Sequence, residues 1–351
     1  MADPSRLVRE PTDRAVAAAG EAIRRGELIG MPTETVYGLA ANAVDDRAVA
    51  RVFEAKARPS FDPLIVHVVD VEQARRYTDA WPDVADRLAN AFWPGPLTIV
   101  VKKRRRSGAA RRAQVIGDLV TSGLPSVALR VPSHPVARAL IESAGVPIAA
   151  PSANRFGRIS PTRPEYVVEE LGDALAMVLD GGPCETGVES TVVSCVEPHD
   201  VRVLRLGGVS VERLEEVLGR SVTLARAGDS RGAEEARGKA SPGMLDKHYA
   251  PATPLRLRDR IDAAACELAR KEGVARLGVL CFSRPSAWPR EACEACVALS
   301  ERGDLTEAAA NLFAAMRELD AAGVDVILAE RVPQRDLGRA INDRLERAAH
   351  R

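Results

Sequence analysis

The sequence predicts an α/β protein with two domains, and three observations support this prediction. The chain has 351 residues, more than a single domain usually holds. Short apolar runs typical of buried strands alternate with segments of helical periodicity. A stretch from Ala225 to Ala240 breaks this pattern, since it is rich in Gly, Ala, Arg and Glu and has no periodicity. Such a composition predicts a flexible linker between two folded parts.

The part before the linker is predicted to be an α/β domain that ends near residue 220. Thr12 or Asp13 can cap a first helix, and Pro59 ends a second helix that runs from Arg47 to Ala57. Further helices are expected at 84–91, 135–144, 164–171 and 211–218. Strands are expected at 27–32, 64–69, 97–101, 127–131, 146–149, 177–179, 191–195 and 201–206.

The part after the linker predicts a smaller α/β unit. It begins after the segment SPGMLDKHYAPATP, whose prolines favour an extended, semi-rigid backbone. Strands are expected at 255–257, 277–282, 296–299 and 324–328, and helices at 261–271, 306–322 and 337–348.

Composition excludes several classes of protein. Lys plus Arg and Asp plus Glu both number 49, so bulk charge gives no reason to expect nucleic-acid or membrane binding. No apolar run approaches the roughly 20 residues that span a bilayer, and the N-terminus has no apolar signal region, so we expect a cytoplasmic protein. The six cysteines are expected to be reduced thiols. Cys293 and Cys296 form one C-x-x-C, and with no second pair or histidine near in sequence an incidental pair is favoured over zinc.

Several common catalytic and nucleotide motifs are absent from the sequence. There is no G-x-x-x-x-G-K-[ST], no strand-linked G-x-G-x-x-G, no G-x-S-x-G and no H-E-x-x-H. A bound nucleotide would therefore be held by a binding site without any of these motifs.

Polar side chains instead gather where predicted strands and helices end. The segment MPTETVYGLAANA places Thr33, Thr35 and Tyr37 after a buried strand, where α/β folds bind ligands. A turn with capping threonines explains the same residues equally well. The segment after Val146–Ala149 carries Ser152, among other hydroxyl and amide groups, and predicts either a phosphate site or a solvent loop.

Cations are placed beside rigid backbone or inside apolar strands. Lys56 and Arg58 end a helix, which favours the helix dipole, but Pro59 and Pro63 then fix their direction, as suits a phosphate chain. Arg130 lies in an apolar strand and is costly there unless it is paired or binds an anion such as a substrate carboxylate.

Two other features have competing explanations. His67 falls in an apolar strand, where a satisfied core histidine is the commoner case. The basic run at 101–112 could contact RNA phosphates, yet it has no interleaved aromatic residues and a basic surface loop is the commoner explanation.

Five segments together resemble the YrdC/Sua5 family, whose members are threonylcarbamoyl-AMP synthases. They occur in the family's order and at its spacing. The linker segment SPGMLDKHYAPATPL and the C-terminal DLGRAINDRLERAA are similar to the long, Sua5-type members, so the resemblance covers nearly the whole chain from about Glu10. The five segments are PTETVYGLAANA, KARPSFDPLIVHV, SVALRVPSHP, PSANRFGRISPT and GVESTVV.

The resemblance implies a fold and a reaction. Residues 10–220 would form a catalytic domain with a twisted mixed sheet around a deep cavity, 221–253 a linker and lid, and 254–351 a small Rossmann-like domain. ATP, L-threonine and bicarbonate or CO2 would give threonylcarbamoyl-AMP and pyrophosphate, with Mg²⁺ accompanying the ATP. The product would pass to a separate tRNA threonylcarbamoyl transferase complex, which modifies adenosine 37 of tRNAs that read ANN codons.

The resemblance also implies roles for individual residues. L-Threonine would be held by Thr35, His67, Arg130, the backbone of Ala150 and Ser190. The nucleotide would be held by Lys56, Arg58, Asp62, Ser126, Ser152, Asn154, Ser160, Arg205 and Tyr249. Within that set, the catalytic group around the triphosphate would be Lys56, Arg58, Ser152 and Asn154, and the lid would be His248 with Tyr249.

The chain departs from the family's pattern at Asp62, where Asn is usual. A carboxylate beside phosphates would repel them unless magnesium lies between, so this departure puts the nucleotide contact at Asp62 in question. The linker reads LDKHYAP where a KYRHYAP-like string is common, and the basic run is longer than is usual.

Two other functional classes compete with this assignment. A non-catalytic RNA- or ribosome-binding module would use the basic run for weak tRNA contact. A hydrogenase-maturation carbamoyltransferase would share the first domain but would need acylphosphatase and zinc-finger parts, which this sequence lacks.

Overall fold

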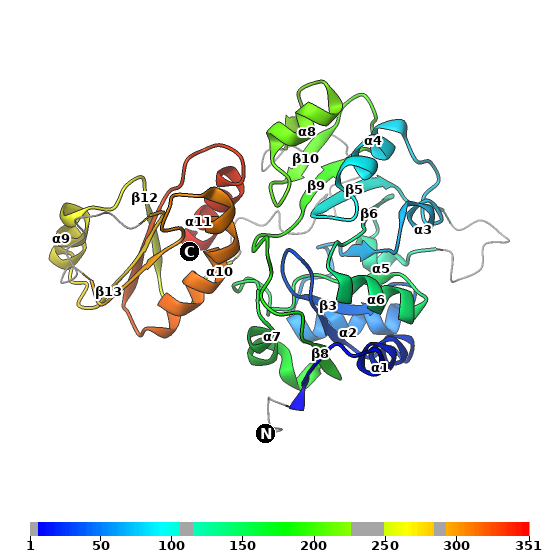
Figure 1. Cartoon of the computed structure of the whole chain (residues 1–351), viewed down its shortest axis with the longest axis horizontal. Coiled ribbons are helices and arrows are strands. Elements are labelled where there is room, and N and C mark those ends of the chain that lie inside the picture. The colour runs from blue at the N-terminus through cyan, green and yellow to red at the C-terminus, as the bar shows by residue number, and fades with distance from the viewer. Residues whose placement is uncertain (1–5, 106–114, 226–248, 284–292, 351) are drawn as a thin grey trace. The chain divides into compact units, whose positions relative to one another are not determined.

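A computed structural model of the chain describes residues 6–105, 115–225, 249–283 and 293–350 (Figure 1). The chain divides into two compact units. Unit 1 comprises Met1–Phe156, Pro161–Glu185 and Glu189–Met244, and unit 2 comprises Gly157–Ser160, Thr186–Val188 and Leu245–Arg351.

Unit 1 is built on an 11-stranded sheet in the order β1-β8-β2-β3-β7-β4-β6-β5-β9-β10-β11. The sheet is mixed, because β6 pairs in parallel with β4 and antiparallel with β5. The predicted mixed α/β fold is therefore confirmed. The strands are β1 Val8–Arg9, β2 Ile29–Met31, β3 Gly38–Asn42, β4 Ile65–His67, β5 Leu97–Lys102, β6 Ser126–Arg130, β7 Ile148–Ala149, β8 Met177–Leu179, β9 Thr191–Ser194, β10 Arg202–Arg205 and β11 Thr223–Leu224.

The helices of unit 1 begin and end largely where capping chemistry predicts. Thr12 caps α1 by accepting from the Ala15 amide, and Asp45 caps α2. Ala57, in the left-handed region at φ 48°, ends α2 two residues before Pro59. The helices are α1 Asp13–Arg24, α2 Asp46–Lys56, α3 Val71–Arg75, α4 Asp83–Phe92, α5 Asp118–Thr121, α6 Pro135–Ala144, α7 Pro164–Leu171 and α8 Val211–Leu218, with a 3-10 turn η3 at Gly172–Ala174.

Both faces of the unit 1 sheet are buried. Along β3, Leu39 and Ala41 belong to one hydrophobic core and Ala40 to another, as the two-residue period of a strand requires. Helices α1 and α6 lie side by side over the second core (Figure 1). They approach so closely that a Cβ atom on Gly20 would lie 2.4 Å from the Ser143 Oγ, so only glycine fits there.

The structure corrects the prediction at β3. No strand was predicted at residues 38–42, yet Gly38–Asn42 forms a buried strand antiparallel to β2. Its small residues carry weak strand propensity, so pairing with β2 and β7 decides its conformation. The short elements β1, α3, α5 and β11 were also not expected.

Unit 2 contains a four-stranded parallel sheet in the order β12-β15-β13-β14. Parallel strands joined through helices confirm the small α/β unit predicted for the end of the chain. Its strands are β12 Leu255–Arg258, β13 Leu277–Cys281, β14 Ala295–Ala298 and β15 Val326–Glu330, and its helices are α9 Ala263–Lys271, α10 Leu305–Ala321 and α11 Gly338–Ala349.

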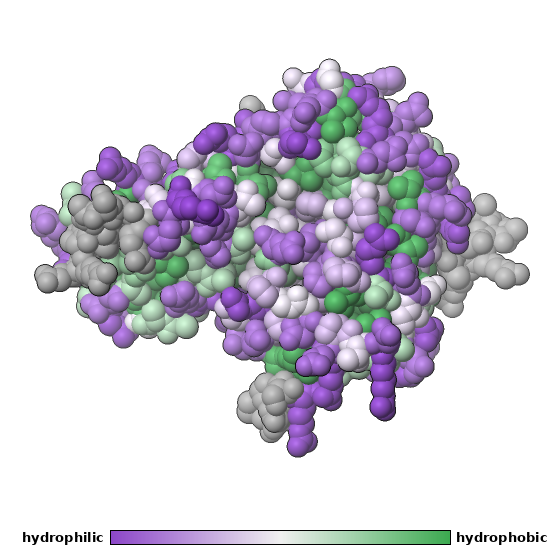
Figure 2. All heavy atoms as spheres, in the orientation of Figure 1, coloured by the Kyte–Doolittle hydropathy of each residue, from purple (hydrophilic) through white to green (hydrophobic). Residues whose placement is uncertain are grey.

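The visible surface is mostly hydrophilic, with hydrophobic residues in small separate groups (Figure 2). Within the described ranges, no helix has the length and apolar character that crossing a membrane requires.

Candidate active site

Three sequence motifs that lie far apart along the chain meet in unit 1. The Leu39 amide donates to the Pro151 carbonyl and the Ala153 amide to the Tyr37 carbonyl, both at 2.8 Å. The Ala150 amide donates to the carbonyl of Ile65 in β4 at 3.0 Å. These hydrogen bonds join three segments into one region of unit 1 and bring their candidate residues together. The segments are 33–39, 65–67 and 150–154.

Arg130 is the centre of the amino-acid side of this region. It ends β6 in register with His67 on the neighbouring β4, and it is 3% exposed. Its Nη2 donates to Glu34 Oε1 at 2.7 Å, its Nη1 to Thr35 Oγ1 at 3.0 Å and its Nε to the Gly95 carbonyl at 3.2 Å. Three of the five guanidinium N–H groups are thus engaged, and two remain for a ligand.

Glu34 was not singled out from the sequence. It is 6% exposed and forms a buried ion pair with Arg130. An available signal was the acid itself, since a carboxylate inside a segment predicted to line a site needs a cation nearby.

The threonine pair beside Arg130 has a defined hydrogen-bond polarity. Thr33 Oγ1 accepts from the amides of Thr35 and Val36 and donates to the Val36 carbonyl at 2.5 Å. The hydroxyl proton in the 2.8 Å contact between Thr33 and Thr35 must therefore come from Thr35. Because Thr35 also accepts from Arg130, its hydroxyl can only accept a further hydrogen bond.

Burial and the Arg130 charge set the protonation states of this cluster. Burial by itself raises the pKa of Glu34, but the Arg130 charge and hydrogen bond outweigh burial, and the net pKa is lowered. Burial, together with the nearby Arg130 charge, lowers the pKa of His67 to about 3. The cluster therefore holds a carboxylate, a guanidinium and a neutral imidazole at physiological pH.

Lys56 ties the end of α2 to the 152–154 segment. Its Nζ, on a side chain 1% exposed, donates to the Ser152 carbonyl at 2.5 Å and to the Asn154 carbonyl. Burial, and next the neighbouring charge of Arg58, lower its pKa well below the ordinary value. Lys56 thus positions the segment that carries Ser152 and Asn154.

Arg58 and Asp62 form a second buried ion pair, with Nη2 and Oδ2 separated by 2.9 Å. Arg58 also donates to the carbonyls of Asp62 and Pro63. The carboxylate that departs from the family's pattern therefore has a protein cation beside it.

Ser190 and Arg205 meet in a buried polar cluster. The Arg205 side chain donates to the Ser190 carbonyl at 2.9 Å through Nη2 and at 3.1 Å through Nε. Thr98 Oγ1, on β5, lies 2.7 Å from Ser190 Oγ. Thr98 is a further residue that the sequence did not single out, because its partner is 92 residues away.

The remaining predicted residues fall in several places. Ser126 begins β6 in unit 1. Ser160 and Tyr249 belong to unit 2, where the Tyr249 ring stacks on Phe313 at 5.5 Å and lies under the Arg344 guanidinium. His248 lies outside the described residues.

The start of the basic run is paired with acids. Lys102 forms an ion pair with Glu197 and Lys103 with Asp118. The rest of the run, from residue 106, lies outside the described residues. These two lysines are therefore each paired with a carboxylate.

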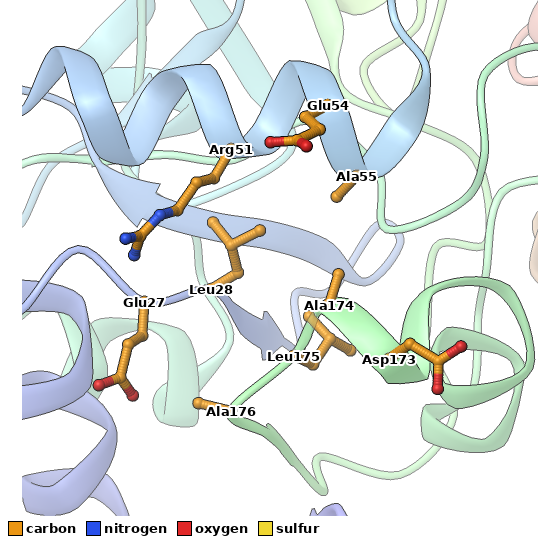
Figure 3. Close-up of a pocket in the computed structure, with 9 residues that line it drawn as sticks. All are labelled: Glu27, Leu28, Arg51, Glu54, Ala55, Asp173, Ala174, Leu175 and Ala176. Atoms are coloured by element: carbon orange, nitrogen blue, oxygen red, sulfur yellow. The ribbon is translucent and has the colours of Figure 1, made fainter. Parts of the chain in front are cut away.

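A surface hollow of about 530 Å³ lies elsewhere on unit 1 (Figure 3). It contains none of the residues singled out from the sequence. Three carboxylates around it would repel a triphosphate, so it does not compete with the site above. Its lining residues are Glu27, Leu28, Arg51, Glu54, Ala55, Asp173, Ala174, Leu175 and Ala176.

In the described part of the chain, no group of three or more His, Cys, Asp or Glu side chains is arranged to hold a metal ion. Cys293 and Cys296 are half-buried.

Comparison with known proteins places both parts of the chain. Residues 21–207 match the Sua5/YciO/YrdC family, described as "Telomere recombination", and residues 209–350 match the "Threonylcarbamoyl-AMP synthase, C-terminal domain". The chain is 39% identical to threonylcarbamoyl-AMP synthase of Bacillus subtilis, over 96% of this chain and 93% of the relative. It is 40% identical to that of Pyrococcus abyssi, over 93% and 92%.

A solved structure agrees with these relatives. The crystal structure of P. abyssi Sua5 complexed with L-threonine superimposes with a TM-score of 0.84 at 37% identity, over 98% of this chain and 96% of that one. The resemblance inferred from the five segments is confirmed, and with both family matches falling on one chain, this protein belongs to the Sua5/YrdC family in its long form with a Sua5 C-terminal domain.

Proposed function

We propose that this protein is a threonylcarbamoyl-AMP synthase, an ATP-using enzyme that transfers an adenylyl group. It would join L-threonine, bicarbonate or CO2 and ATP into threonylcarbamoyl-AMP and pyrophosphate. The names of its relatives and the L-threonine bound in its structural neighbour support this proposal. The observation that carries it is Arg130, a buried cation with two uncommitted N–H donors beside Thr35 and His67.

Arg130 would bind the α-carboxylate of threonine. Its two remaining donors sit in a planar fork that matches a carboxylate. The neutral imidazole of His67 and the acceptor oxygen of Thr35 are suited to the hydroxyl and amine of the same substrate. The Ala150 carbonyl and Ser190 would complete the contacts.

The nucleotide would lie against the segment that Lys56 organises. Ser152 and Asn154 supply neutral polar groups there, and Arg58 and Arg205 supply charge. Ser126, Ser160 and Tyr249 would add contacts to the nucleotide, and Tyr249 with His248 would act as the lid. Magnesium would travel with ATP and be held chiefly by phosphate oxygens, since no described cluster of acids is arranged to hold it alone.

The chemistry would be two linked steps, an addition to CO2 and then a displacement at phosphorus. The lone pair of the threonine amine attacks the carbon of CO2, forming an N–C bond and, after loss of a proton from nitrogen, a carbamate. A carbamate oxygen then attacks the α-phosphorus, and the bond to the bridging oxygen breaks to release pyrophosphate. No protein nucleophile is needed, so the side chains act by positioning and charge neutralisation. A carbamate decomposes in water, which gives enclosure a physical purpose.

The product would serve a separate tRNA-modifying transferase in the cytoplasm. An acyl adenylate is an activated donor, so an acceptor enzyme must consume it.

The test supplies the purified full chain with ATP, L-threonine and ¹³C-bicarbonate and follows the adenylate by mass spectrometry. We expect a threonylcarbamoyl adenylate that is heavier by one mass unit, and pyrophosphate release that requires both threonine and bicarbonate. The same measurement on Arg130→Gln tests the role of Arg130. Arg76→Gln, which removes an exposed arginine outside the site, is its matched control.

Two results would refute the proposal. Pyrophosphate release independent of bicarbonate would mean that a different acid is activated. Absence of any adenylate, with nuclease-resistant RNA bound to the purified protein, would favour an RNA-binding module.

A further inference from the structure

The amino-acid side of the site contains more acceptor capacity than the predicted threonine contacts use. Glu34 is more than nine-tenths buried, and its Oε1 accepts a hydrogen bond from Arg130 at 2.7 Å. Its Oε2 is buried and makes no hydrogen bond. The backbone amides of Glu34 and Ser133 help to lower the pKa of this carboxyl, but neither lies in hydrogen-bond geometry with Oε2.

A buried carboxylate oxygen without a donor is costly, and native proteins seldom leave one. A ligand donor would remove that cost. The neighbouring Thr35 hydroxyl is also limited to accepting a further bond, because its proton goes to Thr33 and Arg130 donates to it. Two acceptors therefore lie on either side of one guanidinium, joined to its Nη1 and Nη2.

This arrangement is complementary to a zwitterion. The Glu34–Arg130 pair has no net charge, and neither does an α-amino acid. A carboxylate on the two remaining donors of Arg130 would place the adjacent α-ammonium, with its three N–H donors, next to the two acceptors. Each buried charge would then face an opposite one, which a ligand with only a carboxylate cannot achieve.

We propose that Glu34 is a substrate-binding residue that receives the α-ammonium of the amino acid through Oε2 while Oε1 holds Arg130. Glu34 thereby selects zwitterionic α-amino acids over hydroxy acids of the same shape. This inference rests on the proposed function, because it takes threonine as the ligand.

The experiment measures binding of two ligands to the full chain by calorimetry in the presence of ATP and Mg²⁺. One ligand is L-threonine, and the other is 3-hydroxybutanoate, which keeps the carboxylate and hydroxyl and lacks the amine. In Glu34→Gln we expect threonine affinity to fall at least about 10-fold, as for a lost charged hydrogen bond. Affinity for 3-hydroxybutanoate should be unchanged or higher, so the preference for threonine falls.

Two further variants keep the test decisive. Glu72→Gln removes a carboxylate from an exposed Glu–Arg pair and should leave the preference unchanged. Glu34→Asp keeps the charge, so its preference should stay within about threefold of the parent. If Glu34→Gln fails to fold, a collapsed preference in Glu34→Asp would overturn the proposal and a retained one would support it.

The other outcomes are equally clear. Unchanged threonine binding in Glu34→Gln, or equal loss of both ligands, would overturn the proposal, because Glu34 would then only hold Arg130 in place. A parent protein that binds threonine with the expected preference but forms no labelled adenylate would refute the proposed function and leave this inference standing.

Discussion

Two buried ion pairs in the described part of unit 1 have similar geometry, but one joins residues close in sequence and the other joins residues far apart. Arg58–Asp62 and Arg130–Glu34 have N–O separations of 2.9 and 2.7 Å, and all four side chains are less than a tenth exposed. The first pair spans four residues within one loop, whereas the second joins residues 96 apart. A local pair can shape only its own loop, while a long-range pair fixes two motifs against each other.

This difference predicts unequal costs when the arginine is removed. Arg130→Met leaves the Glu34 carboxylate buried with no counter-charge, and we expect unfolding free energy to fall by about 3–5 kcal/mol. Arg58→Met should cost less, about 1–3 kcal/mol, because Asp62, although buried, lies next to exposed Phe61, and rearrangement of this one loop would be enough to bring its carboxylate to water. Urea unfolding of both variants measures the difference.

The control for these variants is Arg76→Met, which breaks an exposed pair and should cost less than about 1 kcal/mol. Adding Glu34→Gln to Arg130→Met should recover part of the loss, since the stranded charge is then gone. Equal costs at positions 58 and 130 would contradict the topological argument.

The long-range pair also has a titratable neighbour. The folded pKa of His67 is about 3, against an ordinary 6.5, so only the unfolded chain takes up this proton between those values. The contribution of neutral His67 to the free energy of unfolding is complete above pH 6.5. It is lost as the pH falls toward 3, at up to about 1.4 kcal/mol per pH unit. His67→Gln should flatten this dependence by about 2–3 kcal/mol between pH 6.5 and 4.

His199→Gln, which replaces an exposed histidine, is the matched control. Unfolding measured at several pH values compares the two. If His67→Gln keeps the same pH dependence of the free energy of unfolding as the parent protein, other groups cause that dependence.

The sequence identified several candidate residues that lie close together in the structure, but it did not identify the contacts that hold them in place. Arg130 was recognised because a charge in an apolar strand needs a partner, but the partner lies 96 residues away, so the sequence around Arg130 could not identify Glu34 as that partner. Thr98 was not predicted for the same reason, since its partner Ser190 lies 92 residues away. Asp62 was noticed only as a departure from a family, although it stands four residues from its cation.

Fold prediction failed where tertiary pairing overrides local preference. Caps and prolines located α1 and α2 within a residue or two, because capping is a local interaction. Strand β3 has the sequence GLAAN, which has no β-branched residue and forms a strand only because β2 and β7 lie on either side.

Lys56 offers a test of the opposite side of the site. Lys56→Met keeps the aliphatic volume but leaves the Ser152 and Asn154 carbonyls without their donor, at an expected cost of about 1–3 kcal/mol. Pyrophosphate release should be lost, because the segment carrying Ser152 and Asn154 is no longer fixed. Hydrogen exchange at residues 152–156 reports the loosening directly.

Lys103→Met is the control for that variant. Lys103 bonds Asp118 and Thr121, away from the 152–154 segment, so activity should persist. Full activity in Lys56→Met would remove the proposed link between this lysine and the phosphate side.

The smallest expected effect on stability concerns Asp62 and tests what the local pair is for. In Asp62→Asn the Arg58 side chain keeps its bonds to the Asp62 and Pro63 carbonyls, and the amide oxygen of Asn can still accept from Arg58, so we expect a loss of only about 1 kcal/mol. Function should change more than stability. With the carboxylate gone, Asp62 no longer offsets the Arg58 charge, and ATP affinity should rise about 3- to 10-fold, most clearly at low salt. Weaker or unchanged ATP binding would mean that the pair serves the loop alone, whereas tighter binding would mean that Asp62 weakens the attraction of Arg58 for the nucleotide.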